Sequence, residues 1–354
     1  MRPEGILKRT PDDFVVDELP LYEPSGQGEH LYVRFEKRGR TTDDVVRAFA
    51  KGLGADVRDV GVPGMKDKIA VTTQTISIPP VRGTSRDAML ARLGALSLDG
   101  VRVLDAKFHG NKLRTGHLAG NRFTIHVRSI APEAVAGVVA TFERIGREGC
   151  PNAYGHQRFG MHGNNADRAK SWLLGEWPGP KDPKKQRFLF SALQSAMFND
   201  VLNARVDDGS FRVPRLGDLL EKHQTGGLFP CTDPETDRVR AEAFEISPTG
   251  PMFGVSMRWP EGETADLERS VLSRWIGNEE VLSRVRRLGE GTRRLLRIQV
   301  SGLEVAPIEP SGGDIRLQFV LPKGAYATTV LSEALTLVEP KAPSDDDGKQ
   351  DSPE

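Results

Sequence analysis

Strand-like and helix-like patterns are unevenly distributed along this chain of 354 residues, and their order is the strongest constraint on its fold. Short segments with alternating apolar side chains fill the first part, and helical periodicity dominates from about residue 163 to 303. A strand pattern then returns at 315–322. Strands interrupted by a helical block are typical of an α+β core that carries an inserted domain. We therefore expect an α+β protein of about two domains, the number that a length of roughly 150 residues per domain also suggests.

Individual segments can be assigned to helices and strands. A helix is expected to begin after Thr41 or Thr42, which can cap it, and to end at Gly54, because glycine adopts the left-handed conformation at little cost. Apolar residues at helical spacing predict further helices at 191–206, 265–277 and 327–338. Alternating or β-branched residues predict strands at 13–19, 30–35, 71–78, 123–128 and 315–322.

Several classes of protein are excluded by what the sequence lacks. The longest apolar stretch is the short run 134–140, far below the ~20 residues that span a bilayer. The N-terminal segment has no apolar region of a secretory signal, and the two cysteines form no CxxC pair, so we expect a cytoplasmic protein without a membrane partner. Dinucleotide-binding, P-loop and α/β-hydrolase motifs are missing from the sequence, and the histidines lack metal-ligand spacing.

The charge of the chain is balanced overall but unevenly distributed. Basic and acidic residues number 49 each, so no bulk attraction to nucleic acid is expected. The segment 341–354 is acidic and rich in Pro, Asp and Ser, and we expect it to be a disordered tail. Clusters of arginine and lysine elsewhere can be solvated surface or nucleic-acid contacts, and charge alone does not decide between them.

The segment 64–68, Gly-Met-Lys-Asp-Lys, is the sharpest candidate for chemistry. Asp67 lies between two lysines just before a predicted strand, and opposite charges nearby favour an ionised carboxylate. Such a carboxylate can act as a nucleophile or a base at neutral pH. The alternative is a turn aspartate that caps its own backbone between solvated lysines.

Six motifs, in order along the chain, resemble those of the TruD family of tRNA pseudouridine synthases. The second of them, GMKDKIAVTTQ, resembles the catalytic motif of the family. Ala153 departs from the family pattern, which commonly has an aromatic residue beside Tyr154. The other five are LKRTPDDFVVDE, HGNKLRTGHLAGNRF, PNAYGHQRFG, SALQSAMFN and LPKGAYATTVL.

The resemblance implies a fold, a reaction and a substrate. The fold would be the pseudouridine-synthase fold, a mixed, mostly antiparallel sheet flanked by helices, with an inserted mainly helical α+β domain. Residues 1–157 and 304–340 would form the catalytic domain and 158–303 the inserted TruD-type domain. The implied reaction isomerises uridine to pseudouridine in tRNA, at uridine 13, after the base is flipped out. No cofactor or metal is implied, and we expect a monomer without an obligate protein partner.

Site residues follow from the positions that match the family motifs. Asp67 would be the catalytic aspartate, with Lys8 as its basic partner, although Lys8 can also be an ordinary surface lysine. The resemblance places the substrate-binding residues at Phe14, Asn121, Phe123, Tyr326, Lys66, Lys112, Arg114 and Arg158. The phenylalanines can equally belong to the core, and Arg158 can instead brace its own loop. Of the basic residues in this set, three are candidates for phosphate contacts: Lys112, Arg114 and Arg158.

Two other functions stay open from the sequence. A catalytically silent RNA-binding or RNA-folding protein could keep the same aromatic and basic residues, although the intact Asp67 argues against it. A hydrolase would need a second carboxylate near Asp67, and the sequence shows no adjacent candidate. Binding of tRNA that weakens with salt is expected for the RNA-directed functions only.

Overall fold

The computed structural model describes residues 2–160, 162–309 and 311–340, so the predicted disordered tail lies outside the described residues. The chain divides into two compact units. Described residues of Met1–Glu143, Ser301–Gly324 and Ala334–Glu354 form the first unit, and those of Arg144–Val300 and Ala325–Glu333 form the second. No helix among the described residues is long and apolar enough to cross a membrane.

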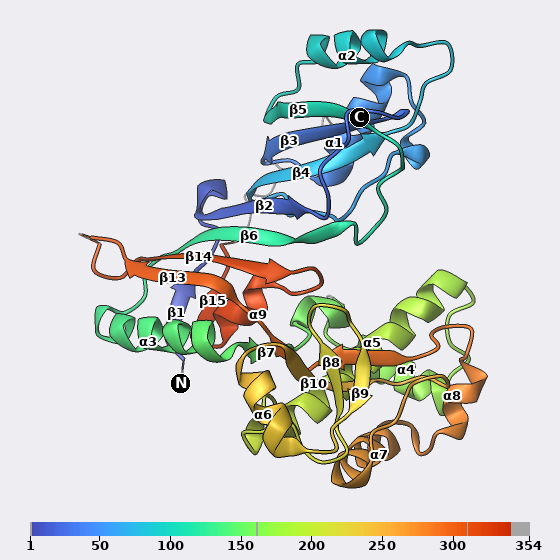
Figure 1. Ribbon diagram of the computed structural model, residues 1–354, viewed down its shortest axis with the longest axis vertical. Helices are drawn as coiled ribbons and strands as arrows, with labels where there is room; N and C mark the ends of the chain where they lie inside the picture. Colours follow the sequence, from blue (N-terminus) through green and yellow to red (C-terminus); the bar gives the residue numbers. More distant parts are fainter. Residues whose placement is uncertain (1, 161, 310, 341–354) are drawn as a thin grey trace, which may run out of the picture. The chain divides into compact units, whose positions relative to one another are not determined.

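A seven-stranded sheet forms the centre of the first unit, with its strands in the order β13-β14-β6-β2-β4-β3-β5 (Figure 1). The pair β2–β4 is parallel, and the other neighbouring pairs are antiparallel. The predicted mixed, mostly antiparallel sheet is therefore confirmed. Its strands are β2 (Phe14–Pro20), β3 (His30–Arg38), β4 (Val71–Ile78), β5 (Val101–His109), β6 (Leu118–Val127), β13 (Ser301–Pro307) and β14 (Ile315–Pro322).

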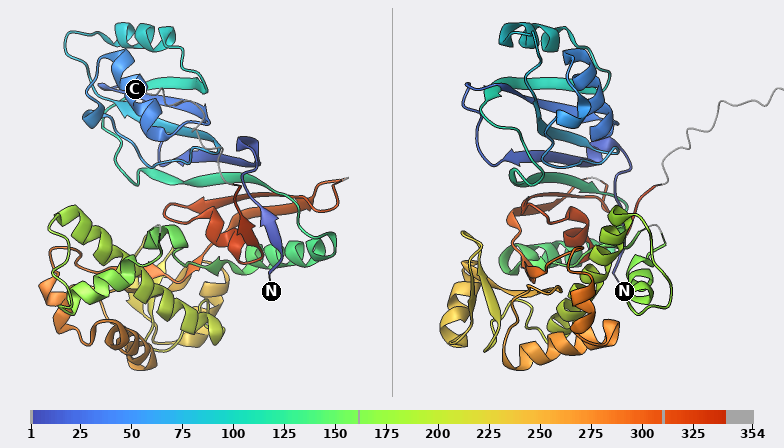
Figure 2. Two further views of the ribbon diagram at one scale, coloured as in Figure 1. Left: turned by 180° about the vertical axis from the view of Figure 1, so that it is seen from behind. Right: turned by 90° about the vertical axis from the view of Figure 1, so that its right-hand side faces the viewer.

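Helix α1 (Thr42–Leu53) covers one face of this sheet, behind the strands in Figure 1 and in front of them in the left view of Figure 2. Thr41 caps it by accepting a hydrogen bond from the N–H of Asp44, and Gly54 ends it at φ +77°, as predicted. Its apolar side packs against alternate residues of β3, and each such buried side chain contributes about 1.5–3 kcal/mol. The residues of β3 in this contact are Leu31, Val33 and Phe35.

Two short strands join the beginning of the chain to its last described residues. Strand β1 (Glu4–Ile6) pairs in parallel with β15 (Thr336–Val338). The predicted helix at 327–338 is wrong in its second half, because α9 ends at Ser332 and Thr336–Val338 is extended. The pairing with β1 supplies these residues with backbone hydrogen-bond partners that a local pattern cannot reveal. The remaining elements before residue 149 are η1 (Pro11–Asp13), η2 (Val57–Asp59), α2 (Arg86–Ala95) and α3 (Pro132–Glu148).

The second unit combines helices with a four-stranded antiparallel sheet in the order β11-β10-β8-β9. Its largest apolar cluster gathers side chains from α4, α5, α7 and α8. The predicted α+β character with many helices is thus present. Its elements are β7 (Cys150–Pro151), η3 (His156–Phe159), α4 (Asn165–Leu173), α5 (Pro183–Asp207), β8 (Leu219–Lys222), β9 (Leu228–Pro230), α6 (Pro234–Glu242), β10 (Ile246–Met252), α7 (Gly262–Ile276), α8 (Glu280–Arg284), β11 (Thr292–Leu295), β12 (Arg297–Ile298) and α9 (Ala327–Ser332).

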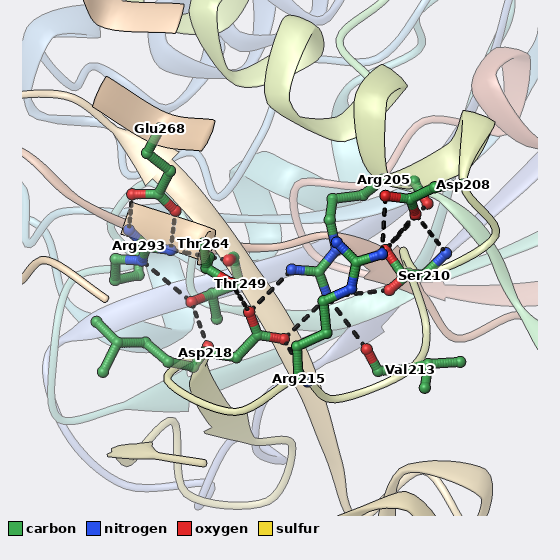
Figure 3. Close-up of polar contacts among 11 residues, drawn as sticks. Arg205, Asp208, Ser210, Val213, Arg215, Asp218, Thr249, Thr264, Glu268 and Arg293 are labelled. Atoms are coloured by element: carbon green, nitrogen blue, oxygen red, sulfur yellow. Dashed lines mark hydrogen bonds and ion pairs between the residues drawn. The ribbon is translucent and has the colours of Figure 1, made fainter. Parts of the chain in front are cut away.

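Buried ion pairs tie the helices of the second unit to its sheet (Figure 3). Arg205 of α5 donates to both carboxylate oxygens of Asp218 at 2.8 and 2.9 Å, and Arg293 of β11 donates to both oxygens of Glu268 on α7 at 2.7 and 2.8 Å. Thr264 of α7 adds a 2.7 Å hydrogen bond to Asp218. All four charged side chains are at most 1% exposed, so each charge depends on its partner for stabilisation.

Candidate active site

Asp67 lies in the loop before β4, and its carboxylate is paired with Lys8. Nζ of Lys8 is 2.9 Å from Oδ2 of Asp67, although 59 residues separate them in sequence. The carboxylate is 59% exposed, whereas the lysine side chain is 7% exposed. A carboxylate that is open to solvent on one side and held by a buried cation on the other is accessible to a substrate.

The position of Lys8 depends on an unusual backbone conformation and on a second carboxylate. Lys8 has a φ of +59°, a left-handed conformation that non-glycine residues seldom adopt. Nζ also lies 3.1 Å from Oε1 of Glu339, which directly follows β15, and 4.8 Å from the centre of the Phe14 ring. Burial lowers the pKa of Lys8, but the hydrogen bond and the charge of Asp67, with those of Glu339, outweigh it and leave that pKa raised. Lys8 is therefore a cation at neutral pH.

A second buried lysine holds the backbone of the same loop. Lys37, at the end of β3, is fully buried and donates to the backbone carbonyl of Asp67 at 2.7 Å and to that of Arg40 at 2.8 Å. The hydroxyl of Thr42 accepts the N–H of Lys66 at 3.0 Å and donates to Gln74 at 2.9 Å. The loop around Asp67 is thus held in place through both its backbone and its side chains.

The charge of Lys37 is expected to make stability depend on pH. Burial lowers the pKa of Lys37 to about 8, with the charge of Asp67 opposing this shift, whereas an ordinary lysine titrates at 10.5. Between these values the unfolded chain binds a proton that the folded chain has lost. The contribution of Lys37 to the free energy of unfolding therefore rises with pH, by at most about 1.4 kcal/mol per unit.

Urea unfolding followed by circular dichroism, for the wild type and Lys37→Met, would measure this effect. The wild type is expected to gain stability relative to the variant between about pH 8 and pH 10.5, since the difference cancels the other titrating groups. A difference that does not change with pH would contradict the assignment.

The remaining predicted residues of the first unit lie in or near the sheet. Lys66 contacts Asn121 of β6 through a 2.5 Å hydrogen bond from Nζ to Oδ1. Phe14 and Phe123 are 5% and 6% exposed and meet edge to face, with ring centres 6.0 Å apart. Phe123 also stacks on Phe319 at 5.4 Å. Both rings therefore serve the core, the alternative left open by the sequence, and only a small part of each is accessible.

The two basic residues of the loop before β6 face outward. Nζ of Lys112 is 4.0 Å from Oδ1 of Asp59, a distance at which an exposed ion pair contributes little. Arg114 is exposed. Both side chains are at least partly exposed at the surface of the first unit.

Tyr326 and Arg158 belong to the second unit. Tyr326, just before α9, is 50% exposed. Arg158 donates to the hydroxyl of Ser195 at 3.1 Å, and its guanidinium lies 5.4 Å from the centre of the Tyr154 ring. Arg158 is thus tied to Ser195 of α5 and to Tyr154 in its own loop, and it keeps part of its side chain at the surface.

Arg294, which the sequence did not single out as a site residue, stacks on the same tyrosine. Its guanidinium lies 4.2 Å from the centre of the Tyr154 ring, and Nη2 donates to Oδ1 of Asn152 at 2.5 Å. Burial lowers the pKa of Arg294. Its neighbour Arg293 points to the interior, as successive residues of a strand point to opposite faces.

Other contributors to the site escaped sequence analysis, although their positions carried a signal. Glu18 continues the buried alternation of Phe14 and Val16 in β2, and Lys37 continues that of Leu31, Val33 and Phe35 in β3. When a charged residue continues a buried apolar alternation, its side chain is expected to be buried as well. Such a residue is almost always paired with an opposite charge or a hydrogen-bond partner. Glu339 gave no such signal, because it reaches Lys8 only through the β1–β15 pairing.

Comparison with a solved structure defines the fold class. The crystal structure described as the putative tRNA pseudouridine synthase D of Methanosarcina mazei superposes with a TM-score of 0.73 at 22% sequence identity. The match covers 95% of this chain and 94% of that chain. The chain therefore has the fold of that protein, and the predicted pseudouridine-synthase fold is confirmed.

Comparison of sequences defines the family. Residues 2–177 and 182–334 match the family model described as tRNA pseudouridine synthase D (TruD). Proteins of that name from Anaeromyxobacter sp. (strain Fw109-5) and Thermus thermophilus are 44% and 41% identical to this chain. Each match covers 94% of this chain, with 92% and 88% of the respective relative. The chain belongs to the TruD family. The predicted class of enzyme is confirmed with it, since pseudouridine synthases are isomerases.

Proposed function

We propose that this protein isomerises uridine 13 of tRNA to pseudouridine, with Asp67 as the catalytic carboxylate. The observation that carries the proposal is the exposed carboxylate of Asp67, held by buried Lys8 within a chain of the TruD family. The silent RNA-binding alternative finds no support here, because this carboxylate and its cation are both intact.

The reaction rearranges two bonds of one nucleotide. The bond between C1′ of the ribose and N1 of uracil breaks, the base turns, and C1′ forms a bond to C5. The hydrogen on C5 leaves as a proton and N1 takes up a proton, so atoms and charge balance without an oxidant or a reductant. Asp67 either attacks the nucleotide or removes a proton from it, and in both cases the carboxylate must be ionised. Nζ of Lys8 lies 2.9 Å from Oδ2 of that carboxylate.

The substrate base must leave its stack to reach Asp67. Unstacking costs a few kcal/mol, which aromatic and hydrogen-bonding contacts to the extruded base can offset. Tyr326 is the most exposed of the proposed aromatic contacts, and Asn121 offers a carboxamide to the edge of the base. Phe14 and Phe123 contribute ring edges, since both are largely buried.

Contacts to the tRNA backbone are proposed for Lys112, Arg114 and Arg158. These side chains lie at least partly at the surface and can neutralise phosphates without reading sequence. Affinity for tRNA should then fall as salt rises, with a slope that reports the number of phosphates contacted. We further propose that residues 158–303 form the inserted domain of the family and that the enzyme acts in the cytoplasm as a monomer.

Tritium release from tRNA tests this function. Purified protein is incubated with tRNA carrying tritium at C5 of its uridines, beside the same tRNA with cytidine in place of uridine 13. Release is expected from the first tRNA only, to one equivalent per molecule. Release from both tRNAs would refute the position, and salt-sensitive binding without release from either would favour the RNA-binding function.

A further inference from the structure

A buried chain of polar groups links three neighbouring strands of the sheet, from β4 through β2 to β6. Strands β2 and β4 pair only as far as Asp17 and Thr73. Beyond that point the side chain of Glu18 lies beside β4, where Oε1 accepts the N–H of Thr75 at 3.1 Å. Its Oε2 lies 3.5 Å from Nζ of Lys66, which in turn donates to Oδ1 of Asn121.

The chemistry of lysine fixes the direction of this chain. An ammonium group donates three hydrogen bonds and accepts none, so it can contact only the oxygen of the Asn121 carboxamide. A carboxamide has similar shapes in its two orientations, and only its partners determine which one it adopts. With its oxygen engaged by Lys66, Asn121 offers its NH2 group, a donor, to any other partner.

Lys66 is poorly placed to contact a phosphate. Its side chain is 8% exposed and that of Glu18 is 3% exposed, so the positive charge is compensated inside the protein. Burial lowers the pKa of Lys66 and raises that of Glu18, and the charge of each partner opposes the shift in the other. Lys68, two residues further along the loop, is exposed and provides a natural comparison.

We propose that Glu18 and Lys66 are positioning residues that lock the Asn121 carboxamide with its NH2 group toward the substrate, where it recognises a carbonyl oxygen of uracil. This inference rests on the proposed function and gives Lys66 a role within the protein in place of a direct contact with RNA. Because the carboxamide of Asn121 cannot flip, it always presents a donor to the base. It therefore selects a base with an acceptor at the edge that faces Asn121, since an unpaired buried donor costs free energy.

Lys66→Met tests the inference against a phosphate contact, with Lys68→Met as the matched control. Loss of the lock is expected to lower kcat/KM for tritium release about 10- to 100-fold. The slope of tRNA affinity against salt should stay at the wild-type value in Lys66→Met, and the loss of kcat/KM should be larger than in Lys68→Met. A slope reduced by about one with unchanged kcat would assign Lys66 to a phosphate and overturn the inference.

Two further variants keep the test independent of folding defects. Glu18→Gln retains the shape of the side chain and its bond to Thr75, so it should fold and lose activity in the same direction as Lys66→Met. The double variant should lose no more than the worse single variant, because both changes break one chain. If the losses of activity in the two single variants add up in the double variant, Glu18 and Lys66 act independently and the inference is refuted.

Asn121→Asp distinguishes the contact with Lys66 from the NH2 group that is proposed to contact the base. An aspartate keeps the contact with Lys66 but has no NH2 group, so activity should be lost although the pair is retained. Wild-type activity in this variant would contradict the inference. Failure of the proposed function would be recognised by a different result, since the wild-type protein itself would then release no tritium from tRNA.

Discussion

Asp67→Asn is expected to abolish tritium release from tRNA. The amide has the shape of the carboxylate, but it carries no negative charge and is neither a competent nucleophile nor a base. Removing such a group lowers turnover by about 10⁴-fold or more in enzymes where it has been changed alone. The change leaves the backbone carbonyl of Asp67 free to accept from Lys37, so the loop should keep its place.

The control for this experiment is Asp99→Asn, which removes the same charge from a fully exposed side chain of the first unit. It should release tritium at the wild-type rate. Affinity for tRNA should be retained in Asp67→Asn, since phosphate contacts dominate binding. Turnover that survives in Asp67→Asn would leave the reaction in place and refute the choice of residue.

Asp218→Asn is expected to lower the free energy of unfolding of the second unit by about 3–5 kcal/mol. Asp218 is fully buried and accepts from Arg205, from Thr264 and from the N–H of Arg215 (Figure 3). An asparagine has one acceptor oxygen and no charge, so the guanidinium of Arg205 would remain buried without a counter-charge. The cost is that of the uncompensated cation and exceeds the net contribution of the pair itself.

Tryptophan fluorescence during urea unfolding measures this effect on the second unit alone. All four tryptophans, at 172, 177, 259 and 275, lie in that unit. Glu242→Gln is the matched control, because its ion pair with Arg238 on α6 is more than half exposed and should contribute less than about 1 kcal/mol. Equal losses in the two variants would show that the buried network is not held by charge.

Sequence patterns predicted the helices and strands that bury apolar residues on one side only. Helix α1 has its cap, its apolar stripe and its terminal Gly54 within fourteen consecutive positions, and the structure confirms each of them. Strands β3 and β14 alternate between core and surface, so period-two patterning located them. Asp67 and Lys8 were likewise found from motifs, although only the fold shows that they touch.

Strand β10 was not predicted, because its sequence argues against a strand. Ile246–Met252 contains Pro248, Gly250 and Pro251, yet all seven residues are buried between β8 and β11. Proline is normally confined to edge strands, since it cannot donate to a neighbour. The partners here come from residues about 25 and 45 positions away, and no local pattern contains that information.

The sequence by itself determined the class of fold, the family and the catalytic candidate Asp67, because these depend on periodicity and on motifs that are local. Only the tertiary structure shows that Lys8 touches that carboxylate, and that Lys37 and Glu18 contact the same region from within the sheet. The physical reason is burial. A charged group taken out of water must find its partner in space, and here the partners are supplied by strands distant in sequence.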